Sequence, residues 1–218
     1  MNRVFNLWLT WLILSLAIIA ILVFALIRIR GRRLGNQEDQ TALGNYGAEV
    51  NDYLKKGRYD EAVQVALKAL RDTPRDASIY DQIALIYLMR AGKDSAARER
   101  WIAEAATYSN KALSREPDGA IIIRDAARTF ETAADLSPSN RCFYYGRATE
   151  LSDHLKRVLG KDYITIGGET YVVDPSRKGF VAYGQTFRVE PLLAENEKLL
   201  ERLKTKTAQA GCLSDRSN

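Results

Sequence analysis

The chain offers few side chains for acid–base, nucleophilic or metal chemistry. Its single histidine, His154, lies in a helical stretch without a second ligand or a nucleophile at a suitable spacing. A catalytic base or a metal site needs such partners, so we expect His154 to lie at the surface or at a helix end. Gly167-Gly168 is followed by neither Lys-Ser nor Lys-Thr, which indicates a turn rather than a phosphate loop. We therefore predict no catalytic, cofactor or metal site and a protein that is not an enzyme.

The cysteines and two adjacent tyrosines are the other side chains with potential roles. Cys142 and Cys212 are the only cysteines, and a disulfide framework needs more of them in a compact secreted chain. We therefore expect two free thiols and a reducing compartment. Tyr144 and Tyr145 are consecutive on an expected helix, so at most one can point fully inward. The other is predicted to be a surface contact residue.

A membrane anchor is predicted near the start of the chain. Residues 7–27 contain no charged side chain, and Trp8 and Trp11 lie at one end. A helix of about 20 apolar residues spans the hydrocarbon core of a bilayer, and indole rings favour its boundary. A cleaved signal peptide would need a small-x-small site at the end of the apolar run, and residues 24–27 lead into Arg28 without one. We expect an uncleaved anchor over residues 1–34, including its basic flank.

The net charge of +5 belongs to this anchor. Residues 1–34 hold five arginines and no acidic residue, which leaves 27 basic and 27 acidic residues in the rest of the chain. The remaining chain is therefore neutral overall, and no nucleic-acid partner is predicted.

The same arginines predict the orientation of the anchor. Arg3 precedes the apolar run, whereas Arg28, Arg30, Arg32 and Arg33 follow it. Because basic flanks tend to remain cytoplasmic, we expect a single-pass protein, typical of a bacterial inner membrane, with its C-terminal domain in the cytoplasm. A periplasmic or lumenal domain is the alternative.

Helical patterning covers residues 43–159, after a polar linker over residues 35–42. Pro74 and Pro117 close similar segments, because each follows the Ala of an Ala-Leu pair by five residues. Such internal similarity is typical of repeat proteins.

The segment from Tyr53 to Pro74 resembles a tetratricopeptide repeat, a helix–turn–helix unit of about 34 residues. Gly57 supplies the turn, and Pro74 ends the second helix. The small residues at which the two helices cross are Ala62, Ala66 and Ala69. The resemblance implies a solenoid of stacked helix pairs.

Two weaker units follow. Residues 77–90 match a first helix, with a turn expected at Ala91-Gly92. Because Pro117 lies farther from Pro74 than one standard period, we expect a longer second helix. Residues 119–130 and 140–159 form a more degenerate third pair, so about three helix pairs are predicted in all.

The period changes after Gly160. Residues 163–173 alternate around Gly167-Gly168, which predicts a hairpin, and residues 180–189 predict a third strand. A helix is predicted over residues 191–208, followed by a disordered tail over residues 209–218. Its apolar stripe would cover the small sheet or cap the repeats, and consists of Leu192, Asn196, Leu199 and Leu203. The predicted fold is thus mainly α, with a small antiparallel β segment over residues 160–190.

The resemblance also implies a function. First helices of such repeats line a concave groove that binds a peptide or a helix of a partner protein. The register places these candidate groove residues: Asn51, Leu54, Lys55, Ser78, Asp81, Leu85 and Leu88. Chaperone-binding members use a clamp of basic and amide side chains, but here Asp125 falls at one clamp position and would repel a carboxylate.

We therefore expect a membrane-tethered adaptor for a protein partner in a membrane-associated complex. Its lipid contact is the bilayer around residues 7–27, and neither a cofactor nor a small-molecule substrate is expected. The alternative is a periplasmic or lumenal chaperone or accessory subunit of an envelope complex. An enzymatic role for residues 160–190 is a distant third.

Overall fold

The computed structural model describes residues 46–166, 169–173, 179–182 and 185–212. The chain divides into two units, residues 1–48 and 49–218, and the account below concerns the second. The predicted anchor over residues 7–27 and the linker over residues 35–42 lie outside the described residues. Within the described residues, no helix combines the length and the apolar character that a bilayer crossing requires.

The described chain is mainly helical, as predicted. Residues 46–55 form a first helical segment, and six longer helices follow it. They are α2 (Tyr59–Asp72), α3 (Ala77–Lys93), α4 (Arg98–Arg115), α5 (Ala120–Leu136), α6 (Arg141–Leu159) and α7 (Val189–Gln209).

Glycine and proline define several of the helix ends. Gly57 adopts a φ of 70° between the first helical segment and α2, a conformation that costs glycine little. The helices α2, α4 and α5 all end one or two residues before a proline. Proline disfavours the helical conformation of the residue before it and lacks a backbone donor, so helix ends are expected at these positions.

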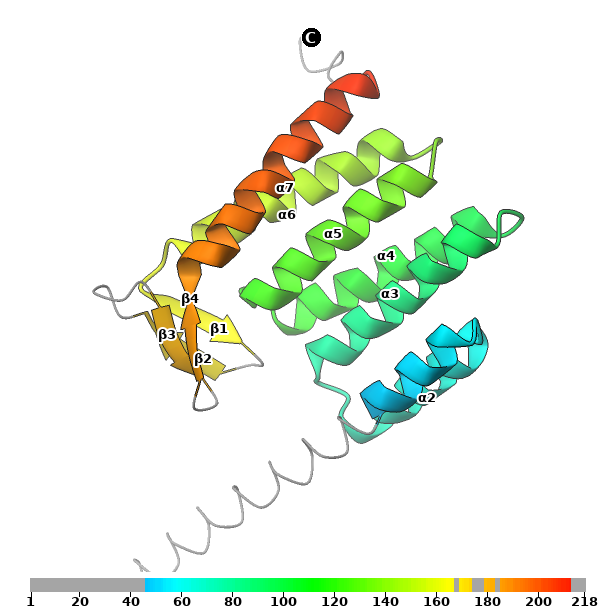
Figure 1. The fold of residues 1–218 in the computed structure, drawn as a ribbon, viewed down its shortest axis with the longest axis horizontal. Coiled ribbons are helices and arrows are strands. Elements are labelled where there is room, and N and C mark those ends of the chain that lie inside the picture. Colours follow the sequence, from blue (N-terminus) through cyan, green and yellow to red (C-terminus); the bar gives the residue numbers. More distant parts are fainter. Residues whose placement is uncertain (1–45, 167–168, 174–178, 183–184, 213–218) are drawn as a thin grey trace, which may run out of the picture. The chain divides into compact units, whose positions relative to one another are not determined.

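The helices form two layers (Figure 1). Within residues 49–218, the segment 49–55, α3, α5 and α7 lie in front, with α4 and α6 behind. The helix α3 packs against α4, and α5 packs against α6. In addition, α3 contacts α5, and α7 packs on α6. We call the exposed surface of segment 49–55, α3, α5 and α7 the front face.

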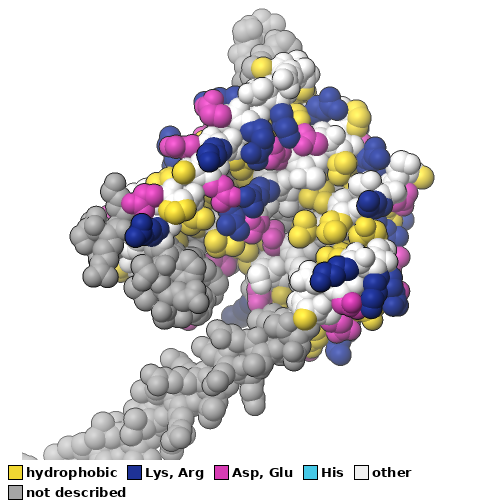
Figure 2. Space-filling model, viewed as in Figure 1, with side chains coloured by type: hydrophobic (Ala, Val, Ile, Leu, Met, Phe, Trp, Pro, Cys, Tyr) yellow, Lys and Arg dark blue, Asp and Glu magenta, His cyan; other side chains and the backbone are white. Residues whose placement is uncertain are grey.

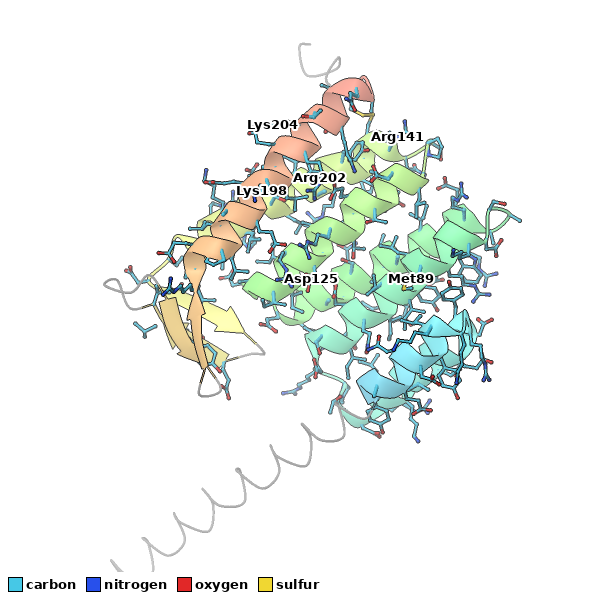
Figure 3. All side chains as sticks on the ribbon, in the orientation of Figure 1. Met89, Asp125, Arg141, Lys198, Arg202 and Lys204 are labelled. Carbon is cyan, nitrogen blue, oxygen red and sulfur yellow. A yellow bond between two sulfur atoms is a disulfide. The ribbon has the colours of Figure 1, made fainter. Side chains whose placement is uncertain are left out.

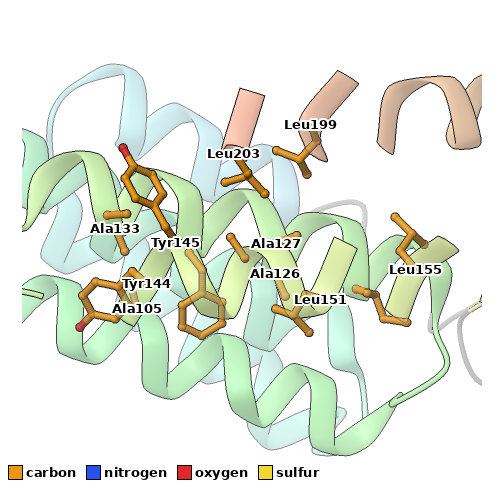
Figure 4. Close-up of a cluster of buried hydrophobic side chains, with 14 of the residues drawn as sticks. Ala105, Ala126, Ala127, Ala133, Tyr144, Tyr145, Leu151, Leu155, Leu199 and Leu203 are labelled. Atoms are coloured by element: carbon orange, nitrogen blue, oxygen red, sulfur yellow. The ribbon is translucent and has the colours of Figure 1, made fainter. Parts of the chain in front are cut away.

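Small side chains let these helices approach closely. Ala105, Ala126, Ala133 and Ala148 are all completely buried in the main core. Figure 4 shows alanines of α4 and α5 beside leucines from α6 and α7. An alanine at a crossing point adds apolar contact without separating the helix axes, so the alanine-rich pattern fits the layered packing.

One detail of the helical region differs from the prediction. The turn expected at Ala91-Gly92 lies later, because α3 continues to Lys93 and α4 begins at Arg98. Asp94 holds this turn, since its carboxylate accepts hydrogen bonds from the Ala97 backbone at 3.1 Å and from the Trp101 indole at 3.0 Å.

The β region also differs from the prediction. The first hairpin pairs β1 (Tyr163–Ile166) with β2 (Glu169–Val172). The expected third strand is two strands, β3 (Gly179–Ala182) and β4 (Gln185–Arg188), which pair with each other in a separate two-stranded sheet. Pairing within the segment satisfies backbone groups that a single long strand at the edge of a short hairpin would leave open.

The expectation of two free thiols is wrong. Cys142, at the start of α6, and Cys212, just after α7, form a disulfide with an S–S distance of 2.00 Å (Figure 3). The helix α7 extends to Gln209 and carries Cys212 back to α6. The prediction of a disordered tail over residues 209–218 is therefore wrong for residues 209–212. The bond fastens the far end of α7 to the preceding helix pair.

The expectation for the adjacent tyrosines is also wrong. Tyr144 is 7% exposed and Tyr145 is 4% exposed, because α6 has packing partners on two sides. Tyr144 lies against Phe130, with ring centroids 6.1 Å apart, whereas the Tyr145 hydroxyl donates to Asp135 at 2.6 Å. The exposed aromatic residue at this place is the preceding one, Phe143, at 68%.

Candidate interaction face

The most distinctive surface feature of the front layer is a row of side chains on α3. Asp81, Leu85 and Met89 are spaced by four residues, so they lie on one side of the helix in successive turns. Leu85 is 49% exposed and Met89 is 38% exposed, while Asp81 is half-buried. We call these three residues the α3 stripe. Figure 2 shows hydrophobic side chains gathered over α3 and charged side chains along α7.

Asp81 lies where α3 meets α5. Its Oδ1 atom is buried and has no hydrogen-bond partner among the described residues. Burial first, and then the negative charge of Asp125, raise the pKa of Asp81 from 3.8 to about 7, and the positive charge of Arg124 offsets part of this shift. A carboxyl group with this pKa is partly protonated at neutral pH, so the site holds a carboxylate that the fold does not satisfy.

The α5 side of this contact is an ion pair between consecutive residues. Arg124 donates to Asp125 twice, from Nε at 2.7 Å and from Nη2 at 3.1 Å. Both side chains are about one quarter exposed. Because the guanidinium of Arg124 is engaged by Asp125, it compensates Asp81 only in part. The group of three side chains therefore has an excess negative charge when Asp81 is ionised.

The predicted groove residues differ in how far they are exposed in the structure. Asn51, Lys55 and Ser78 are exposed, and Leu54 is half-buried. The Ser78 backbone and hydroxyl both donate to Asp76, at 2.9 and 2.6 Å, which caps α3. These positions therefore reach the surface, and the cap explains the choice of Ser78 without a partner.

Leu88 is the exception among the predicted groove residues. It is 4% exposed and belongs to the main hydrophobic core. One residue farther along, Met89 is exposed instead and continues the line from Leu85. The repeat register therefore assigned buried Leu88 to the surface and missed exposed Met89, which the four-residue spacing from Leu85 signals.

The α5 and α7 part of the front face is covered by compensated charges. Glu131 on α5 accepts from Arg202 at 2.7 and 2.9 Å and pairs with Lys206 at 3.0 Å. Lys206 also donates to Asp135 at 2.6 Å, and Arg128 pairs with Glu195. Figure 3 labels Arg202 on α7, Asp125 on α5 and Met89 on α3.

This network lowers the pKa of Glu131. Burial alone would raise the pKa, but hydrogen bonds from Arg202 and Lys206 outweigh it. Asn196 adds a buried amide that donates to the Ser152 backbone oxygen at 2.9 Å. The helix α7 is thus held by ion pairs, one buried amide and the disulfide, as well as by Leu199 and Leu203.

His154 has a structural position on the rear layer. Its Nε2 lies 3.1 Å from the Pro117 backbone oxygen and 3.3 Å from an Asp118 carboxylate oxygen. These contacts join α6 to the turn between α4 and α5. A pocket of about 520 Å³ adjoins it, lined by Asn110, Leu113, Ser114, Pro117, Arg147, Glu150, Leu151, His154 and Arg157. Its charged groups are partly paired, since Arg147 donates to Glu150 at 3.1 Å.

In the parts of the chain that the structure describes, no three His, Cys, Asp or Glu side chains are grouped to hold a metal ion. The front face and the rear pocket differ in the side chains that they present. The front face combines exposed apolar side chains with an uncompensated carboxylate, whereas the rear pocket is polar and its charged side chains are partly paired.

No protein-family model matches the chain, and no curated protein matches it.

Proposed function

We propose that this chain is a membrane-tethered interaction subunit whose front face binds a helix or an extended segment of a partner protein. Residues 7–27 serve as the anchor, and the helical domain supplies the binding surface. The observation that supports this best is the α3 stripe, where Leu85 and Met89 are exposed one turn apart beside Asp81. Large apolar side chains that are exposed together are typical of docking surfaces.

The layered arrangement supports the same proposal. In tetratricopeptide repeats, which residues 53–74 resemble, the first helix of each pair lines the binding groove. The front layer holds the corresponding segment 49–55, α3 and α5. We propose that the domain acts by binding rather than by catalysis, and that tethering raises its effective concentration at the bilayer.

We further propose that the domain lies on the periplasmic or lumenal side of the membrane. The specific observation in favour is the disulfide between Cys142 and Cys212, because such bonds persist in oxidising compartments and are rare in the cytosol. The arginines that follow the anchor favour the cytoplasm instead. Flanking charge biases the orientation of a span without fixing it, whereas a stable disulfide requires an oxidising compartment, so the proposal follows the disulfide.

A thiol-accessibility measurement tests this orientation. Cys142 and Cys212 would be replaced by serine, and exposed Ser95, in the turn between α3 and α4, by cysteine. We expect a membrane-impermeant maleimide to label the cysteine introduced at position 95 in cells whose outer membrane is permeabilised and whose inner membrane is intact. Labelling that appears only after lysis would place the domain in the cytoplasm and leave the docking proposal unchanged.

Replacing Leu85 by glutamate tests the docking proposal itself. A charge at the centre of the α3 stripe is expected to reduce the amount of co-purified partner at least tenfold, because charges are excluded from the desolvated centre of an interface. Since Leu85 is half exposed, the substitution should leave folding intact. The measurement is quantitative co-purification from native membranes with the full chain.

Ala103→Glu is the matched control, because Ala103 is exposed on α4 in the rear layer. It should leave the partner yield unchanged. An equal yield from Leu85→Glu and wild type would contradict the proposal, as would an equal loss from both variants.

A further inference from the structure

The acidic group at the contact between α3 and α5 has a feature that the packing of the domain does not explain. Asp81 Oδ1 is shielded from water but receives no hydrogen bond from the described residues. A buried carboxylate oxygen without a donor is unfavourable, and folded proteins rarely keep one without a reason. Asp81 as a whole is only partly buried, so the residue still contributes to the surface of the front face.

The charges around Asp81 favour a cation as the missing partner. Of the charged groups on α2, α4 and α5, the helices packed against α3, the two that act on Asp81 are Arg124 and Asp125. They are bound to each other at 2.7 Å. On α3 itself, no other charged residue lies between Asp76 and Arg90. A donor with positive charge would form a charge-assisted hydrogen bond with Asp81 and neutralise the excess.

The surroundings of Asp81 favour a basic side chain on a helix over a free ion. Leu85 and Met89 follow at one and two helical turns, a rise of about 6 and 12 Å along α3. A helix laid along α3 presents its own side chains at the same spacing. The neighbouring part of the front face offers no comparable charge excess, because Arg128 is paired with Glu195 and Arg202 with Glu131.

We infer that the partner is a basic amphipathic helix, which places a lysine or arginine at Asp81 and apolar side chains over Leu85 and Met89. This inference rests on the docking function proposed above and names the chemistry of the partner. The stripe sets the spacing of the contact residues on the partner helix. If the partner helix runs parallel to α3, its basic residue precedes its apolar residues in sequence. If it runs antiparallel, the basic residue follows them.

A defined peptide pair tests this inference with the full chain in nanodiscs of zwitterionic phosphatidylcholine. The probe is a fluorescein-labelled, 18-residue helical peptide of alanine, leucine and lysine, with leucines and one lysine row on a single face. Its match carries glutamate in place of lysine. Binding is measured by fluorescence anisotropy, and empty nanodiscs give the contribution of lipid.

We expect the lysine peptide to bind and the glutamate peptide not to bind. Asp81→Asn should weaken binding of the lysine peptide at least tenfold, whereas Asp153→Asn, which removes an exposed carboxylate from α6, should change it less than twofold. Binding to wild type should strengthen severalfold from pH 6 to pH 8 as Asp81 ionises, and Asp81→Asn should abolish this pH dependence.

Two results would overturn the inference. One is failure of the wild-type chain to bind the lysine peptide in preference to its glutamate match, and the other is equal binding by wild type and Asp81→Asn. The docking function is judged separately, because Leu85→Glu tests it through the native partner. Loss of that partner with Leu85→Glu, but not with Asp81→Asn, would retain the docking face and exclude a cation at Asp81.

Discussion

Replacing Cys142 and Cys212 together by serine is expected to lower the free energy of unfolding by about 4 kcal/mol, because the bond closes a loop with a sequence separation of 70 residues. The disulfide restricts the unfolded chain, and its removal restores that conformational entropy. The native structure should change little except at the end of α7, where the disulfide supplements the ion pairs of Lys206. The measurement is a denaturant titration of the full chain in mild detergent, followed by far-ultraviolet circular dichroism.

A reducing agent supplies the internal control. It should shift the unfolding midpoint of the wild-type protein toward that of the double variant and leave the double variant unchanged. Equal midpoints for wild type and the double variant without reductant would mean that the two thiols are not joined in the purified protein. That result would also remove the main support for a periplasmic or lumenal domain.

Asp81→Asn is expected to stabilise the domain at pH 8, even though it is expected to weaken partner binding. The pKa of Asp81 is raised from 3.8 to about 7 in the folded chain, first by burial and then by Asp125. The folded state therefore binds the Asp81 proton more tightly than the unfolded state does. The stability that this proton contributes is fully present below about pH 4 and is lost as the pH rises through about 7. Asparagine cannot ionise and therefore avoids this loss.

The magnitude follows from the same pKa values. Each pKa unit corresponds to about 1.4 kcal/mol, so the gain at pH 8 should be roughly 2 to 4 kcal/mol, and it should shrink to near zero at pH 4. Denaturant titrations of wild type and Asp81→Asn at both pH values measure it, with Asp153→Asn as the control for loss of a surface charge. A destabilised Asp81→Asn at pH 8 would show that Asp81 makes a favourable contact in the free domain.

The expected effects of Asp81→Asn on stability and on partner binding have opposite signs, and together they indicate the role of Asp81. A residue that destabilises the free domain but strengthens a complex is typical of a binding site, because natural proteins retain unfavourable groups where function requires them. A purely structural residue would act in the same direction in both measurements. Asp81→Asn therefore separates a functional carboxylate from an accident of packing.

The helical architecture could be predicted because its determinants are local. Gly57 supplies the left-handed turn, Pro74 and Pro117 follow helix ends, and small residues mark the crossings. These features act within a few residues of one another, so they are readable in a sequence. The stripe of α7 was predictable for the same reason, and its Asn196, Leu199 and Leu203 are buried as expected.

The features that were predicted wrongly depend on contacts between segments that are distant in sequence. Cys142 and Cys212 meet only because α7 runs back along α6, and two cysteines alone do not specify a pair in sequence. Tyr145 is buried because α5 brings Asp135 to its hydroxyl. A rule about one helix with one buried side could not anticipate a helix that packs on two.

The candidate site combines both cases. Asp81 and Leu85 were assigned to the front face by the repeat register. Asp125 appeared in the sequence only as a position unsuited to carboxylate binding, and its effect on Asp81 emerges from the packing of α3 on α5. The buried state of Leu88 and the exposure of Met89 depend on the exact rotation of α3, which a register within one repeat fixes only to about one residue.

The central claim is that the front face of α3 contacts a protein partner, and site-specific photo-crosslinking from position 85 tests it most directly. Benzoylphenylalanine would replace Leu85 in one variant and Thr107, an exposed residue of α4 in the rear layer, in another, with both expressed as full chains in their native membrane. We predict a discrete adduct from position 85 that Asp81→Asn diminishes, and no such adduct from position 107. Equal adducts from both positions, or an adduct from position 107 alone, would contradict the assignment of the front face as the docking surface.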